Sequence, residues 1–80
     1  MTQLTIKVLF FGQLVDVTGK TGMDLQDVTD TQAALEALTV LYPRLSQTPF
    51  LLALDKEIVE GKVPFTGDHT LALLPPYAGG

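Results

Sequence analysis

The sequence predicts an α+β fold in which one main helix packs on one face of a mixed β-sheet. Segments with the two-residue period of strands lie near both ends of the chain. Only residues 32–42 form a long segment with the period of a helix. The chain has 80 residues, enough for one small domain, and a single helix can cover only one face of a sheet.

The first expected strand covers residues 4–11, because its apolar residues alternate as in a half-buried strand. Its inward face is expected to carry Leu4, Ile6, Val8 and Phe10. Residues 13–18 are ambiguous between a loop and one helical turn.

The segment Gly19-Lys20-Thr21-Gly22 predicts a turn, since both glycines can adopt positive φ. It does not have the Gly-x-x-x-x-Gly-Lys-Ser/Thr spacing of a phosphate-binding loop. A weaker second strand is expected over residues 23–28, with Met23 and Leu25 pointing inward.

The main helix is expected over residues 32–42. Residues 29–31 supply candidate N-caps, and Thr29 with Gln32 fits a capping box. Pro43 ends the helix because the residue before a proline disfavours helical geometry. The helical stripe that we expect in the core consists of Ala34, Leu35, Leu38, Leu41 and Tyr42.

The second half of the sequence supplies three further strands. Residues 50–54 are apolar without clean alternation, which indicates a central strand of the sheet. The expected order is a polar connector at residues 44–49 anchored by Leu45, a central strand at 50–54, a turn at 55–57, a short strand at 58–59, a loop at 61–68 and a last strand at 69–74.

Residues 75–80 are expected to form an extended tail after a folded domain of residues 1–74. Prolines donate no backbone hydrogen bond, so the last strand must stop and the chain should leave it stiff and extended. The terminal glycines suit a narrow channel in which a Cβ would clash. We interpret the tail as the functional segment: Pro75, Pro76, Tyr77, Ala78 and Gly79 thread the channel, and Gly80 carries the reactive carboxylate.

The composition excludes several classes of function. The sequence has no cysteine, so disulfides, thiolate metal sites and cysteine nucleophiles are impossible. One histidine does not predict a metal site, and no catalytic triad can be assembled, so we expect no enzymatic activity from the chain alone. A net charge of −4 disfavours nucleic acid and favours partners with basic surfaces. We expect no membrane span and a cytoplasmic location.

Three pieces of the sequence carry a resemblance to a known family. They are the opening Ile6-Lys7-Val8-Leu9-Phe10-Phe11-Gly12, the Gly67-Asp68 turn before the last strand, and the Pro-Pro-x-x-Gly-Gly ending. Together they resemble the small subunit of molybdopterin synthase, a ubiquitin-like sulfur carrier, over most of the chain. The expected element order matches the β-grasp fold of that family. The sequence departs from the family pattern at three positions. Asp55 lies where asparagine is common, His69 where an acidic residue is common, and Tyr77 where valine is common.

The resemblance implies a mechanism. An adenylating enzyme related to ubiquitin-activating enzymes would use ATP to convert the Gly80 carboxylate to an acyl-adenylate, and sulfur would then replace the adenylate. The thiocarboxylate would enter the active site of the molybdopterin synthase large subunit, in a heterotetramer, and pass its sulfur to cyclic pyranopterin monophosphate. The chain itself would bind no cofactor and no metal.

Two other functions remain open. One is a sulfur carrier for thiamin synthesis or tRNA thiolation, although thiamin carriers are typically shorter and lack the Pro-Pro exit. The other is a ubiquitin-like modifier, or a plain binding module, whose terminus joins lysines of other proteins or does nothing.

A docking surface for the large subunit is expected on the sheet face opposite the helix. Phe11 and Leu74 lie outside the inward-facing sets of their strands, and they become neighbours if the first and last strands pair. Ile58 would join them from the short fourth strand. Contiguous apolar surface on a small protein typically marks an interface.

Two sets of polar residues are interpreted as ordinary surface. His69 stands alone beside a turn, so we expect a solvated strand-end histidine rather than a ligand or a base. Asp24, Asp27 and Asp30 span a strand and a helix start, where solvation and helix capping explain them.

Overall fold

The computed structural model describes residues 4–76 and contains one five-stranded sheet in the order β2-β1-β5-β3-β4. Strands β1 and β5 pair in parallel and the other neighbours pair antiparallel, so the sheet is mixed as predicted. The strands are β1 Thr5–Phe10, β2 Gly22–Gln26, β3 Leu51–Leu54, β4 Glu57–Val59 and β5 His69–Leu74. The expected short strand at residues 58–59 therefore forms and pairs with β3.

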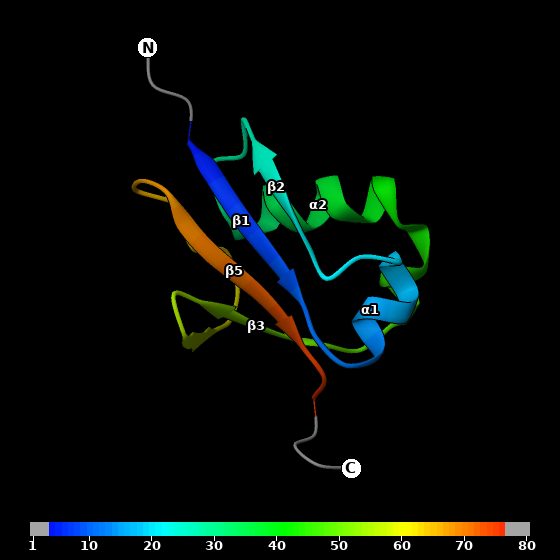
Figure 1. Cartoon of the computed structure of the whole chain (residues 1–80). Helices are drawn as coiled ribbons and strands as arrows, with labels where there is room; N and C mark the ends of the chain where they lie inside the picture. Colours follow the sequence, from blue (N-terminus) through cyan, green and yellow to red (C-terminus); the bar gives the residue numbers. More distant parts are fainter. Residues whose placement is uncertain (1–3, 77–80) are drawn as a thin grey trace.

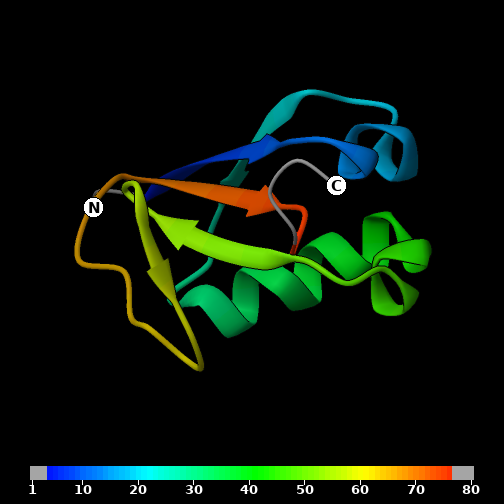
Figure 2. The same ribbon diagram turned by 90° about the horizontal axis from the view of Figure 1, so that it is seen from below.

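One main helix, α2 (Thr31–Leu41), packs along one side of this sheet (Figure 1, Figure 2). The ambiguous segment after β1 is a short helix, α1 (Gln13–Thr18), which ends at Gly19 with φ of 73°. A five-residue 3-10 helix, η1 (Pro43–Gln47), replaces most of the polar connector expected after α2. Its one apolar residue, Leu45, is buried as predicted.

The core lies between α2 and the inward face of β1 and β5. The inward face of β1 is the predicted one: Ile6, Val8 and Phe10 are buried, and Leu4 packs against them. In β5 the alternation places Leu71 and Leu73 in the core and leaves Ala72 and Leu74 on the other side. The period of two in the sequence thus decides which face of each strand is buried.

The start of α2 differs from the capping box expected from Thr29 and Gln32. The N-cap is Asp30, whose Oδ1 accepts a hydrogen bond from the Ala33 amide at 2.7 Å. The backbone carbonyl of Thr29 instead accepts a bond from the amide of Phe65 at 2.9 Å. The capping box was therefore wrong, because the chain before Asp30 pairs with the loop that follows β4.

Leu41 was expected in the core but is 54 % exposed. The buried row of α2 continues from Ala34 and Leu38 to Tyr42, four residues apart each time, so Leu41 turns away from the sheet. The Tyr42 ring meets the Phe10 ring edge-on, with ring centroids 6.1 Å apart.

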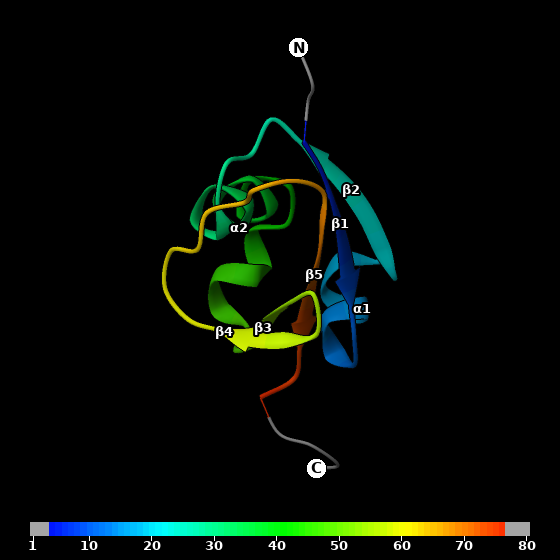
Figure 3. The same cartoon turned by 90° about the vertical axis from the view of Figure 1, so that its left-hand side faces the viewer.

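The loop between β4 and β5 is fastened to the start of α2. Thr31 is fully buried, and its hydroxyl donates to the Gly61 carbonyl and accepts from the Val63 amide, both at 2.9 Å. Figure 3 shows this loop passing over the first turn of α2. No local pattern indicated this role for Thr31, which was one of the candidate N-caps and is instead the first residue of α2.

Candidate functional site

A groove of about 490 Å³ opens on the sheet face opposite α2. All three residues expected at a partner interface line it. Phe11 is 44 % exposed and Ile58 is 57 % exposed, while Leu74 is half-buried. The complete lining is Leu9, Phe11, Ala53, Asp55, Lys56, Ile58, Thr70, Ala72 and Leu74.

Strand register explains why these side chains meet. Leu9 lies opposite Ala72, Ala72 lies opposite Ala53, and Ala53 lies opposite Ile58, so one row crosses four strands. The two alanines in the middle of this row form a shallow floor between larger residues. Phe11 and Leu74 follow at the carboxyl end of the parallel pair, where the Phe11 amide donates to the Leu73 carbonyl at 3.1 Å. Their predicted proximity is confirmed by this pairing.

The exit of the tail lies at the same end of the sheet. β5 ends at Leu74, and Pro75 and Pro76 are both half-buried directly after it. The strand therefore stops where the prolines were expected to stop it. Tyr77, Ala78, Gly79 and Gly80, to which the sequence assigned threading and reaction, lie outside the described residues.

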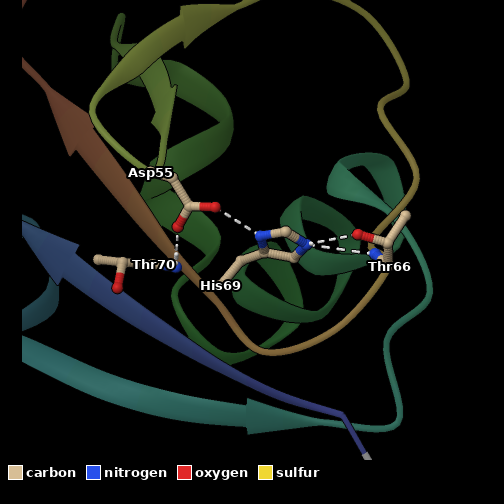
Figure 4. A network of polar contacts seen from close by, with 4 residues as sticks. All are labelled: Asp55, Thr66, His69 and Thr70. Carbon is tan, nitrogen blue, oxygen red and sulfur yellow. Dashed lines mark hydrogen bonds and ion pairs between the residues drawn. The ribbon is translucent and has the colours of Figure 1, made fainter.

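The opposite end of β5 carries a polar network (Figure 4). Asp55 Oδ1 accepts a hydrogen bond from the Thr70 amide at 2.9 Å, and Asp55 Oδ2 lies 2.6 Å from His69 Nδ1. The Thr66 amide donates to His69 Nε2 at 3.2 Å. Because Nε2 accepts, the proton of a neutral ring sits on Nδ1 and is donated to Asp55.

This network corrects the expectation of a solvated histidine, since the His69 side chain is only 17 % exposed. Its ring also lies against Phe65, with ring centroids 5.7 Å apart. The Thr70 amide bond and the bond from His69 both favour the ionised carboxylate, and together they hold the pKa of Asp55 below its usual value.

The network also secures a tight turn between β3 and β4. Asp55 and Lys56 both have positive φ, 49° and 75°, which is unusual for residues with a side chain. The Asp55 amide donates to the Thr70 carbonyl at 2.8 Å, so its backbone and carboxylate both bind the start of β5. In the sequence, Asp55 and His69 are two separate departures from the family pattern, and no local spacing indicates that they contact each other.

Residues 4–76 contain no candidate metal centre. No group of three or more histidine, aspartate or glutamate side chains in this range can hold a metal ion. Of the aspartates set aside earlier, Asp30 caps α2 as expected. In the same range no helix is long and apolar enough to cross a membrane. This surface offers a largely apolar groove that reaches the end of the sheet at which Pro75 follows β5.

The mixed sheet, its strand order and the single helix across it define a ubiquitin-like β-grasp protein. Comparison with family sequence profiles then identifies the group within this fold. The profile of the ThiS family matches residues 8–80, and the chain belongs to that family.

Solved structures of similar proteins share the fold at low sequence identity. A putative molybdopterin converting factor subunit 1 from Pyrococcus furiosus has a TM-score of 0.82 at 12 % identity, covering 92 % of this chain and 99 % of that one. Small archaeal modifier protein 1 from Methanosarcina acetivorans has a TM-score of 0.78 at 19 % identity, with both chains covered in full (100 %). A complex of subunits 1 and 2 of molybdopterin-converting factor from Helicobacter pylori matches with a TM-score of 0.74 at 19 % identity, covering 96 % of this chain and 100 % of that one.

Proposed function

We propose that this protein is the sulfur-carrying small subunit of a molybdopterin synthase. Its Gly80 carboxylate is adenylated by a partner enzyme that uses ATP, and sulfur then displaces AMP to leave a thiocarboxylate. The small subunit docks on the large subunit and donates this sulfur to cyclic pyranopterin monophosphate to form the molybdopterin dithiolene. The chain is not an enzyme alone.

One observation carries the proposal: the largely apolar groove runs along the open sheet face and reaches the end from which the chain leaves towards Gly80. Phe11 and Leu74 line the groove at this exit, and Pro75 follows Leu74 directly. A partner bound over the groove therefore lies beside the end of β5, where the tail begins. Membership of the ThiS family supports a small ubiquitin-like carrier and does not by itself select the pathway. The H. pylori complex, described as one of subunits 1 and 2, supports a two-subunit assembly.

The physical chemistry of the tail suits a carried group. Ordering a flexible segment costs about 1–2 kcal/mol per residue, and two prolines reduce that cost by limiting the unbound ensemble. Gly79 and Gly80 leave the terminal carbonyl unshielded by side chains and let partner backbone approach closely. Adenylation splits one difficult substitution into two easier ones, as covalent intermediates do. The positive charge that stabilises phosphate and thiocarboxylate comes from the partners.

Intact-mass spectrometry tests the carrier role directly. The full chain is incubated with ATP, an adenylating enzyme of the ubiquitin-activating type and a sulfur donor. We expect an oxygen-for-sulfur exchange that fragmentation assigns to Gly80, and no exchange in a chain from which Gly80 is deleted. Sulfur on the truncated chain, or none on the full one, would overturn the proposal.

The pathway is tested by adding the loaded chain to its large subunit and cyclic pyranopterin monophosphate. Formation of molybdopterin supports the assignment. A loaded chain that supplies only a thiazole synthase or a tRNA-thiolating enzyme would move the protein to the alternative sulfur pathways. Ladders of the chain on lysines of other proteins would instead identify a modifier, which the similarity in fold to small archaeal modifier proteins makes worth testing.

A further inference from the structure

Gly12 and Pro75 are in close contact where the chain leaves the sheet. A Cβ atom placed on Gly12 would lie only 2.5 Å from Pro75 Cγ, and 3.5 Å and 3.7 Å from Pro75 Cδ and Cβ. Gly12 also has φ of 57° and ψ of −133°, a conformation open to glycine and strained for other residues. Two independent constraints, space and backbone geometry, therefore require a glycine here.

The surroundings fix Gly12 in place. The Phe11 amide bonds the Leu73 carbonyl at 3.1 Å, which joins the ends of the two parallel strands. Past this bond the chain turns into α1, where the Leu14 amide bonds the Phe11 carbonyl and the Val15 amide bonds the Gly12 carbonyl, both at 3.1 Å. Gly12 is thus held between a strand end and a helix start, next to the exit from β5.

We propose that Gly12 is a positioning residue that seats the ring of Pro75 and so sets the direction in which the chain continues towards Gly80. The inference rests on the proposed function. It adds Gly12, a residue of the folded domain, to the residues of the tail that this function uses. Because the ring of a proline fixes its own φ, holding the ring also holds the path of the backbone through that residue. A tail aimed correctly before docking enters a partner's channel more often, and a misplacement of about 1 Å can cost roughly a hundredfold in rate.

Gly19 provides a matched control. It also has positive φ, 73°, but nothing lies within 4 Å of a Cβ placed on it. Gly19→Ala therefore adds backbone strain without contacting the tail, whereas Gly12→Ala adds strain and collides with Pro75. Pro75→Ala removes the ring atom that collides, and the remaining Cβ position at 3.7 Å is an ordinary contact.

The test measures adenylation of Gly80 by the partner enzyme for the wild type, Gly12→Ala, Pro75→Ala, the double variant and Gly19→Ala, each in the full chain. We expect Gly12→Ala to lower kcat roughly tenfold or more while KM changes less than about threefold, because the change misdirects the tail and leaves the rest of the surface that the adenylating enzyme contacts unaltered. In the Pro75→Ala background the effect of Gly12→Ala on kcat should shrink to about twofold or less, since the collision is gone. Gly19→Ala should leave kcat and KM unchanged.

A second measurement does not depend on activity or on folding of the glycine variants. In the wild-type chain, NMR should show nuclear Overhauser effects between the Gly12 Hα protons and the Pro75 ring protons. Absence of these effects overturns the inference, as does a Gly12→Ala effect of equal size with and without the Pro75 ring. If wild-type Gly80 is never loaded, the proposed function fails instead, while the contact between Gly12 and Pro75 can still be observed.

Discussion

The two ends of β5 are built on opposite principles. At its amino end, side-chain hydrogen bonds tie the strand to a turn and a loop: Asp55 holds Thr70 and His69, and His69 holds Thr66. At its carboxyl end the contacts are apolar: the groove of about 490 Å³, whose lining starts at Asp55 and Thr70, ends here with Leu74 beside Phe11. Directional bonds suit a part of the molecule that must keep one shape, because each bond fixes distance and angle together. Exposed apolar surface suits a part that is completed by a partner.

The largest effect should be on the free energy of unfolding, from a substitution in the middle of β5. Leu71 is fully buried in the middle of β5, so Leu71→Ala should cost about 2–5 kcal/mol in the free energy of unfolding. Its matched control is Leu74→Ala, on the groove side of the same strand, which should cost clearly less. Urea unfolding of both variants checks this order. Equal losses would mean that the two faces of β5 contribute alike to the core.

The apolar end should determine affinity for the large subunit. Phe11→Asp and Ile58→Asp each place a charge in the groove and should weaken binding by about 2 kcal/mol, or roughly thirtyfold. Val40→Asp is the control, because Val40 is 81 % exposed on α2 and does not line this groove. Isothermal titration calorimetry measures the affinities. A control variant that binds as poorly as the other two would remove the groove as the docking site.

The polar end should determine local stability instead. His69→Ala removes the bond to Asp55 and the bond from the Thr66 amide, and should lower the free energy of unfolding by about 1–2 kcal/mol. Amide hydrogen exchange at Thr66 should become faster, while affinity for the large subunit falls less than in the Phe11 variant, because Asp55 but not His69 lines the groove. Weaker docking without faster exchange would show that the two ends are not separate in function.

The smallest expected effect is a pH dependence that arises from Asp55. Its pKa in the folded state is lowered, first by the Thr70 amide and then by His69, from an unfolded value of about 3.9. A lowered folded pKa means that the ionised form stabilises the fold above the unfolded pKa, and that this contribution is lost as the pH falls through the folded pKa. Asp55→Asn should therefore show a flatter loss of stability than the wild type between about pH 5 and pH 2. Identical slopes in urea unfolding would contradict this role for Asp55.

The sequence predicted the parts of the fold that depend on periodicity. Alternation in residues 4–11 identified the buried face of β1, and the same argument placed Phe11 and Leu74 together on the open face. These predictions succeed because a strand has only two faces. Once one residue is known to be buried, alternation determines on which face each of the following residues lies.

The polar contacts were missed because they join residues that are distant in the sequence. His69 meets Asp55 across 14 positions, and Thr31 meets Gly61 across 30. Neither pair follows a local spacing rule, so the role of each residue was interpreted from its immediate neighbours in the sequence alone. The expected capping box failed for the same reason, since Thr29 is engaged by Phe65 from the far loop.

The parallel pairing of β1 with β5 has a consequence for how the molecule is made. Ile6 lies opposite His69, so the central pair of strands joins segments from opposite ends of the sequence. Such long-range closure is slow and comes late, because the chain entropy between the two segments is lost before their contacts are gained. A nascent or truncated chain without β5 lacks both the contact between Gly12 and Pro75 and the tail that follows the strand. Under the proposed function, this topology would allow only a chain that has folded with β5 in place to be loaded with sulfur.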